Sequence, residues 1–205
     1  MLRIPQRLRN LSLAPASYLV LSVPLSAAEF TGDLIMASTT RSMTGRLTVK
    51  DSVYRMDIVQ ESGHMFVIVN QFTNICYVCN PAAKSYRITP TKSPAVLQND
   101  PFQAARYGDS IGVREYRGQD TLDGRVCDRY VIKIGPNPLM TEWIPPDLHF
   151  PIRIENMMAP DSAYLAVTNI AVGPVDTTQL SLPADYTLLE EKPAPEPGGV
   201  KTGGE

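Results

Sequence analysis

The segment SVYRMDIVQ (residues 52–60) decides the fold class of this chain. Apolar and charged side chains alternate in it, in the order Tyr54, Arg55, Met56, Asp57 and Ile58. Successive side chains of a β-strand point to opposite faces, so a period of two predicts a strand with one apolar face. The segment belongs to a sheet that buries one face against a core.

The neighbouring sequence adds more strands. The segment HMFVIVN (64–70) is almost wholly apolar, which is typical of a strand covered on both faces. Segments 74–79 and 84–88 flank the turn residues Asn80-Pro81, and this arrangement predicts a hairpin. The pattern favours strands that follow one another closely along the chain.

A second hairpin is predicted where segments 113–122 and 125–134 flank Asp123-Gly124. This dipeptide is favoured where both turn residues need a positive φ. Apolar residues alternate again through 148–155, and a last long strand is predicted at 163–172. In total we expect about nine to eleven strands in a mainly β (α+β) protein with a meandering antiparallel sheet.

One segment interrupts the strands with a helical pattern. Asp100 is a suitable N-cap, Pro101 suits the first helical position, and Gln103 completes a capping box. We expect a short helix from Pro101 to Tyr107 that ends at Gly108, since glycine favours helix termination. Residues 93–98 predict another short turn before it.

The first 28 residues have the pattern of a secretory signal peptide. They carry three arginines and no acid, an apolar run at 11–25, and small residues that suit cleavage between Ala28 and Glu29. An uncleaved membrane anchor is the alternative, but the apolar run is short and Pro15 and Pro24 interrupt it. We expect export and a soluble mature protein.

Removal of this peptide changes the charge of the chain. The formal net charge of −2 becomes −5 without the three arginines of residues 1–28. A mildly acidic surface argues against nucleic acid and anionic lipid headgroups as main partners. The remaining sequence predicts one domain at 29–191 and a disordered tail at 192–205, which is rich in Pro and Gly.

Short motifs run through most of the chain from residue 29 to 189: Phe30-x-Gly32, Tyr54-Arg55-Met56, Tyr77, Pro81, Lys84-x-Tyr86, Asp123-Gly124, Tyr130, Trp143, Phe150-Pro151-x-Arg153 and Leu182-Pro183-x-x-Tyr186. In these motifs the chain resembles the LolA/LolB-like carriers of bacterial envelopes. The resemblance implies a curved half-barrel with a helical insert on its concave side, an apolar cavity that shelters acyl chains, and a periplasmic location. Domains of unassigned function share this pattern.

An apolar concave face defines the expected ligand site. A ligand with acyl chains gains about 0.8 kcal/mol per buried methylene there. The candidate lining residues are Tyr54, Met56, Ile58, Phe66, Ile68, Phe102, Tyr130, Ile132, Trp143 and Phe150. Seven methionines, at positions 36, 43, 56, 65, 140, 157 and 158, also suit an adaptable pocket, although ordinary core packing explains any one of them as well.

The sequence leaves two other functions open. The first is an envelope sensor or interaction domain that binds a protein partner with the same fold. The second is a hydrolase built on Ser110, because residues 108–112 read Gly-Asp-Ser-Ile-Gly and His149 follows. A nucleophile elbow needs a strand before the serine and a helix after it, whereas the predicted order here is reversed, so we do not expect an enzyme.

The three cysteines predict structure rather than chemistry. Cys76 and Cys79 form a C-x-x-C motif on a predicted strand, and Cys127 stands alone. We expect one disulfide between Cys127 and either Cys76 or Cys79, with free buried thiols as the alternative. Without a second paired motif these cysteines do not predict a zinc site, and no cofactor is expected.

Overall fold

The computed structural model describes residues 29–37, 42–60, 63–158 and 164–189. The predicted signal peptide (1–28) and the whole of the predicted tail (192–205) lie outside these residues. The strands are β1 Glu29–Ala37, β2 Ser42–Lys50, β3 Val53–Gln60, β4 Gly63–Asn70, β5 Ile75–Asn80, β6 Ser85–Pro90, β7 Val113–Leu122, β8 Arg125–Ile134, β9 Asn137–Ile144, β10 Arg153–Asn156, β11 Tyr164–Val172 and β12 Thr187–Leu188. The helices are α1 Pro94–Asn99, α2 Pro101–Ile111 and the 3₁₀ turn η1 Thr177–Leu180.

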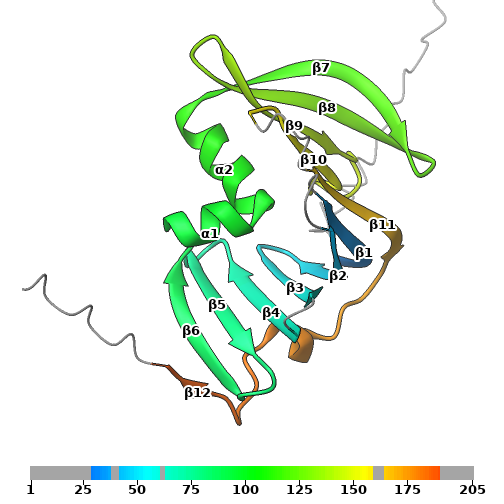
Figure 1. The fold of residues 1–205 in the computed structure, drawn as a ribbon. Coiled ribbons are helices and arrows are strands. Elements are labelled where there is room, and N and C mark those ends of the chain that lie inside the picture. Colours follow the sequence, from blue (N-terminus) through cyan, green and yellow to red (C-terminus); the bar gives the residue numbers. More distant parts are fainter. Residues whose placement is uncertain (1–28, 38–41, 61–62, 159–163, 190–205) are drawn as a thin grey trace, which may run out of the picture.

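All twelve strands form one open, curved sheet. Their order is β12-β6-β5-β4-β3-β2-β1-β11-β10-β9-β8-β7. Every neighbouring pair is antiparallel except β12 and β6, which are parallel. Helices α1 and α2 lie across the open, concave side of the sheet (Figure 1). The expected half-barrel with a helical insert is confirmed, with one strand more than the expected range.

The strand pattern of the sequence matches most of the sheet. The predicted hairpin at 113–134 has the predicted bounds, and both turn residues, Asp123 and Gly124, have a positive φ. The alternation at 148–155 suggested a single strand, and this prediction is wrong, because β10 begins only at Arg153. His149 has a φ of 50°, and its backbone N–H donates to the carbonyl of Pro145, so the chain turns there instead.

The helical insert begins as predicted and ends later. Asp100 caps α2 by accepting hydrogen bonds from the backbone N–H groups of Phe102 and Gln103. The helix does not end at Gly108 but continues to Ile111. Gly108 is buried, and a Cβ at this position would lie 2.8 Å from Cδ2 of Leu139. The glycine therefore permits close packing of α2 against the sheet rather than terminating the helix.

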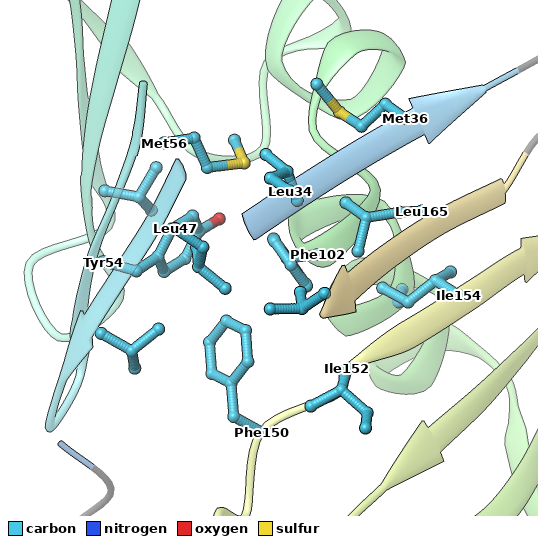
Figure 2. Packing of buried hydrophobic residues seen from close by; sticks show 14 of the residues in the cluster. Leu34, Met36, Leu47, Tyr54, Met56, Phe102, Phe150, Ile152, Ile154 and Leu165 are labelled. Carbon is cyan, nitrogen blue, oxygen red and sulfur yellow. The ribbon is translucent and has the colours of Figure 1, made fainter. Parts of the chain in front are cut away.

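The main core lies between the concave face and the helices. Its centre is an aromatic group formed by Phe30, Tyr54, Phe102 and Phe150, with ring centroids 4.8–5.7 Å apart. Figure 2 shows aliphatic and thioether side chains around these rings, among them Leu34, Leu47, Met56, Ile152 and Leu165. Since α2 contributes Phe102, the helix is packed into the core itself.

A second, smaller core covers the opposite face of the sheet. It contains Phe66, Ile68 and Cys79, against which Leu182 and Tyr186 of the C-terminal segment pack. Both faces of β4 are thus covered, as its almost continuous apolar sequence predicts. In the part of the chain that is described, no helix has the length and apolar character that a membrane span requires.

Candidate functional site

An apolar pocket lies between the two helices and one side of the concave face. Its volume is about 230 Å³. The sheet and the helices both supply lining residues, which are Met36, Ala37, Met43, Leu97, Gln98, Pro101, Ala104, Met140, Ile154, Asn156, Tyr164 and Leu165. Three of the twelve are methionines, whose flexible thioethers adapt to guests of different shape. We call this space the methionine pocket.

Strand register brings the sheet side of the methionine pocket together. Met36 on β1 is paired with Met43 on β2 and with Leu165 on β11. Leu165 is paired in turn with Ile154 on β10. Directly paired residues point to the same face of a sheet, so the four side chains form a continuous row. Met140 on β9, paired with Asn156, extends the lining beside that row.

The helices supply the opposite wall. Leu97 comes from α1, and Pro101 and Ala104 come from α2. Pro101 and Ala104 are three residues apart and so lie on one face of the helix. Phe102 and Ala105 on the same helix are buried in the main core. Helix α2 therefore contacts both the core and the pocket.

A buried polar group joins α2 to the sheet. The hydroxyl of Tyr54 on β3 donates to Oδ2 of Asp100 at 2.5 Å, and Nε2 of Gln103 donates to the Tyr54 oxygen at 2.9 Å. Burial raises the pKa of Asp100 to about 6, although its hydrogen bonds act in the opposite direction. Burial and the nearby Asp100 also raise the pKa of Tyr54. We call Tyr54, Asp100 and Gln103 the polar latch.

A second buried charge lies next to the pocket. Glu142 on β9 is paired in register with Ile154, which lines the pocket, and only 5 % of Glu142 is exposed. One carboxylate oxygen of Glu142 accepts a hydrogen bond from Arg114 at 3.0 Å. Burial raises the pKa of Glu142, while Arg114 lowers it. Arg114 also stacks on the ring of Tyr130, at 4.2 Å from its centroid.

Most of the predicted lining residues fill the core instead of the pocket. Seven belong to the main core, namely Tyr54, Met56, Ile58, Phe102, Ile132, Trp143 and Phe150. Phe66 and Ile68 lie in the smaller core on the opposite face. Tyr130 is half-buried and packs against Tyr116. None of the ten lines the methionine pocket, and their role in binding stays a prediction.

The methionines were the sequence signal closest to the observed pocket. Positions 36, 43 and 140 line it, and Met36 and Met140 also belong to the main core. Met56 is buried in that core without lining the pocket, Met65 packs against the core, and Met157 and Met158 are exposed. Residue type alone does not separate these cases. Met36 and Met43 face each other on consecutive strands, and only the pairing of strands far apart in the sequence brings Met140 to the same pocket.

The serine motif does not have the geometry of a nucleophile elbow. Ser110 lies within the last turn of α2, and its hydroxyl donates to the carbonyl of Tyr107 at 2.7 Å. An elbow instead presents its serine between a strand and the start of a helix. Among the described residues, no hydrogen bond joins Ser110 to His149. The motif is therefore part of a helix end.

The three cysteines are buried free thiols, so the expected disulfide is not formed. Cys76 belongs to the main core and Cys79 to the smaller core, because residues three apart on β5 face opposite sides of the sheet. Burial raises the pKa of Cys76 to about 12 and that of Cys79 to about 11. Within the described residues no group of three or more His, Cys, Asp or Glu could hold a metal ion.

Comparison with solved structures identifies the fold. An uncharacterized conserved protein from Thermus thermophilus superposes with a TM-score of 0.56 at 11 % identity, over 80 % of this chain and 91 % of that one. No protein-family model matches the sequence, and no curated protein matches it either. The likeness to the Thermus protein is one of fold alone.

Two further structures superpose on this chain with lower TM-scores. The MucA/MucB complex of Pseudomonas aeruginosa gives a TM-score of 0.49 at 12 % identity, and the match covers 78 % of this chain but only 58 % of that one. An outer membrane lipoprotein-sorting protein domain from Vibrio parahaemolyticus gives 0.36 at 8 % identity, over 75 % and 89 % of the two chains. What this chain shares with the Thermus protein is its fold, an open curved sheet with helices across the concave face.

Proposed function

We propose that this protein is an exported binding protein of the bacterial envelope, which holds the acyl part of a lipidic ligand in the methionine pocket. The observation that carries the proposal is the pocket itself. It lies on the concave side, it has a volume of about 230 Å³, and methionine, leucine and isoleucine side chains supply much of its wall. The protein acts as a carrier and performs no chemistry on its ligand.

The binding energy comes from removal of acyl chain from water. Each buried methylene contributes about 0.8 kcal/mol. A dry protein cavity of about 150 Å³ holds benzene, which has six carbons, so by proportion 230 Å³ accepts about nine carbons. Burial of nine methylenes yields roughly 7 kcal/mol before the cost of immobilising the ligand. This is enough for specific binding that remains reversible.

The helices control access to the pocket. Because α1 and α2 supply one wall, movement of the helices away from the sheet opens the pocket along its length. The polar latch holds α2 in the closed position by two hydrogen bonds, one donated by the Tyr54 hydroxyl and one accepted by it. Binding and release of a ligand therefore require reversible opening at α1 and α2.

The envelope location rests on the N-terminal sequence. The three-part pattern of residues 1–28 is that of a secretory signal peptide, and it supports export to the periplasm. In that compartment, the two membranes are the apolar environment available to an acyl ligand. A pocket on a soluble protein would replace the membrane as its solvent.

Native mass spectrometry tests the proposal. The protein is expressed from the full sequence, exported and purified without detergent, and bound lipid is then identified by denaturing extraction. We expect a stoichiometric mass excess that resolves into one lipid class. A ligand-free mass that persists after incubation with envelope lipids and with uncharged single-chain lipids would reject the carrier function.

A matched pair of variants assigns the bound lipid to the pocket. Ala104 lines the pocket from α2, so Ala104→Trp fills it. Ala95 is exposed on α1 and does not line the pocket, so Ala95→Trp is the control for an added indole on the helices. We expect Ala104→Trp to lose at least nine tenths of the bound lipid and Ala95→Trp to keep it. Equal retention by both variants would place the lipid elsewhere.

A protein partner is the second candidate function, and one edge of the sheet favours it. Strand β7 is the last strand of the sheet order, so one side of its backbone is unpaired among the described strands. Val113 and Tyr116 on this strand are 62 % and 57 % exposed. An extended segment of a partner can add to such an edge as a further strand. Crosslinking in intact cells would identify this partner if the protein carries no lipid.

A further inference from the structure

The lining of the methionine pocket contains no charged side chain. Its polar members are Gln98, Asn156 and Tyr164, and every other lining residue is apolar. Asn156 faces Met140 in the β9–β10 pair, so its amide lies on the pocket side of the sheet. Amide and phenol groups offer hydrogen bonds to an ester or an amide, but they offer no counter-charge to a carboxylate or a phosphate.

The charged residues nearest in register to the pocket are already paired. Glu142 is paired in register with Ile154, and its carboxylate forms an ion pair with Arg114. The Arg114 guanidinium also lies 4.0 Å from a carboxylate oxygen of Asp109. With two carboxylates around one guanidinium, this cluster has no unused positive charge to offer an anionic ligand. The buried carboxylate of Glu142 repels such a ligand instead.

The volume of the pocket limits the number of acyl chains. At about nine carbons in 230 Å³, the pocket has space for one chain or part of one chain, and not for two side by side. A diacyl lipid would leave its second chain in water or would have to displace core side chains. Such displacement is costly in a well-packed interior.

From the uncharged lining and the small volume, we infer that the pocket selects single-chain ligands with an uncharged ester or amide next to the chain, and rejects fatty acids and phospholipids. This inference rests on the proposed carrier function. Gln98 and Asn156 are the residues that set the preference, by hydrogen bonds to the uncharged polar group. The side-chain oxygen of Asn156 already accepts the backbone N–H of Met158 at 2.9 Å, so its NH2 group is the donor to the ligand. A buried charge without a partner would lose its hydration and gain nothing in exchange.

The sharpest test compares two probes that differ only in charge. Decanamide and decanoate have the same chain, and at pH 8 decanoate is ionised. Calorimetric titration of the delipidated protein, below the micelle concentration, measures both dissociation constants. We expect decanamide to bind at least tenfold more tightly than decanoate. Equal or tighter binding of decanoate would overturn the inference while leaving the carrier function intact, whereas no binding of either probe would count against both.

A chain-length series tests the size of the site. Each added methylene should tighten binding of the neutral amides about fourfold until the chain has about nine or ten carbons. Longer amides should then bind with little further gain. A steady fourfold gain up to sixteen carbons would contradict the single short-chain site.

A charge variant tests the assignment to this pocket. Gln98 is an exposed residue of a short helix, so Gln98→Lys is expected to fold, and it places a positive charge beside the pocket. It should strengthen decanoate binding several-fold and weaken decanamide binding, because the side-chain amide of Gln98 is lost. Asn99→Lys, on the next residue, adds the same charge away from the lining and should change neither. Equal effects of the two variants would reject the role of Gln98.

Discussion

The hydroxyl of Tyr54 lies 2.5 Å from Oδ2 of Asp100, and this hydrogen bond links the third strand of the sheet to the residue that caps α2. The two residues are 46 positions apart in the sequence. Asp100 therefore has two functions, since one carboxylate oxygen accepts the helix backbone N–H groups and the other accepts the tyrosine. The start of α2 is fixed to the sheet through a single side chain.

Removal of the tyrosine hydroxyl should weaken the whole domain. Tyr54→Phe leaves Asp100 and Gln103 buried with one hydrogen bond fewer each, and loss of a buried partner costs about 1–3 kcal/mol. Urea denaturation should show a lower midpoint with an unchanged slope. Tyr116→Phe, at an exposed tyrosine, should leave the midpoint unchanged, and an equal loss in both variants would contradict the latch.

The stability of the protein should fall as the pH rises from about 4 to 6. The folded pKa of Asp100 is about 6, above the ordinary value of 3.8, so the folded state binds the proton more tightly than the unfolded state. The stabilisation is complete below pH 3.8 and is lost as the pH rises through 6, to a total of about 3 kcal/mol.

The variant Asp100→Asn isolates this effect. It removes the titrating group, so the free energy of unfolding should change less between pH 4 and 7 than in the unmodified protein. Glu142, whose pKa is also raised, remains in both proteins and cancels in the comparison. Identical pH profiles of the two proteins would show that Asp100 does not titrate in this range.

Gly45 should not tolerate a side chain. A Cβ at this position of β2 would lie 1.9 Å from the backbone carbonyl oxygen of Asp57 on β3. The two strands would have to separate, so Gly45→Ala should cost about 3 kcal/mol or prevent folding. Thr44→Ala, at the exposed neighbouring residue, should be nearly neutral in the same thermal unfolding measurement.

The thiols should be unreactive until the protein unfolds. All three cysteines are buried, and burial raises the pKa of each thiol, so the reactive thiolate is scarce at pH 8. Alkylation should be slow in the native protein and should reach three thiols in denaturant without a reductant. Detection of only one thiol would instead establish a disulfide.

The sequence predicted the structural elements whose formation depends on neighbouring residues. The alternation from Tyr54 to Ile58 predicted β3, Asp123-Gly124 predicted a hairpin, and Asp100-Pro101 predicted the start of α2. Each of these signals is local, because strand period, turn conformation and helix capping are set by residues a few positions apart.

The sequence could not predict which apolar residues line the pocket. Phe150 and Met36 are both apolar and both belong to the main core, yet only Met36 also lines the pocket, beside Met43 and Leu165. That difference depends on the register of strands more than a hundred residues apart. Leu148 and Phe150 are both buried, two residues apart, as in a strand, yet they do not belong to a strand. Turns in the chain direct these two side chains inward.

The connection between β6 and β7 spans the sheet from one end to the other. Strands β6 and β7 follow each other in the chain, with only the two helices between them. In the sheet, β6 lies next to the edge strand β12, whereas β7 is the opposite edge (Figure 1). Residues 91–112, which contain both helices, therefore form a chord across the arc of the sheet. A chord of fixed length limits how far an arc can flatten, so movement of the helices away from the sheet must also change the curvature of the eleven strands from β6 to β7. The elasticity of the sheet then sets an upper limit on how far the methionine pocket can widen.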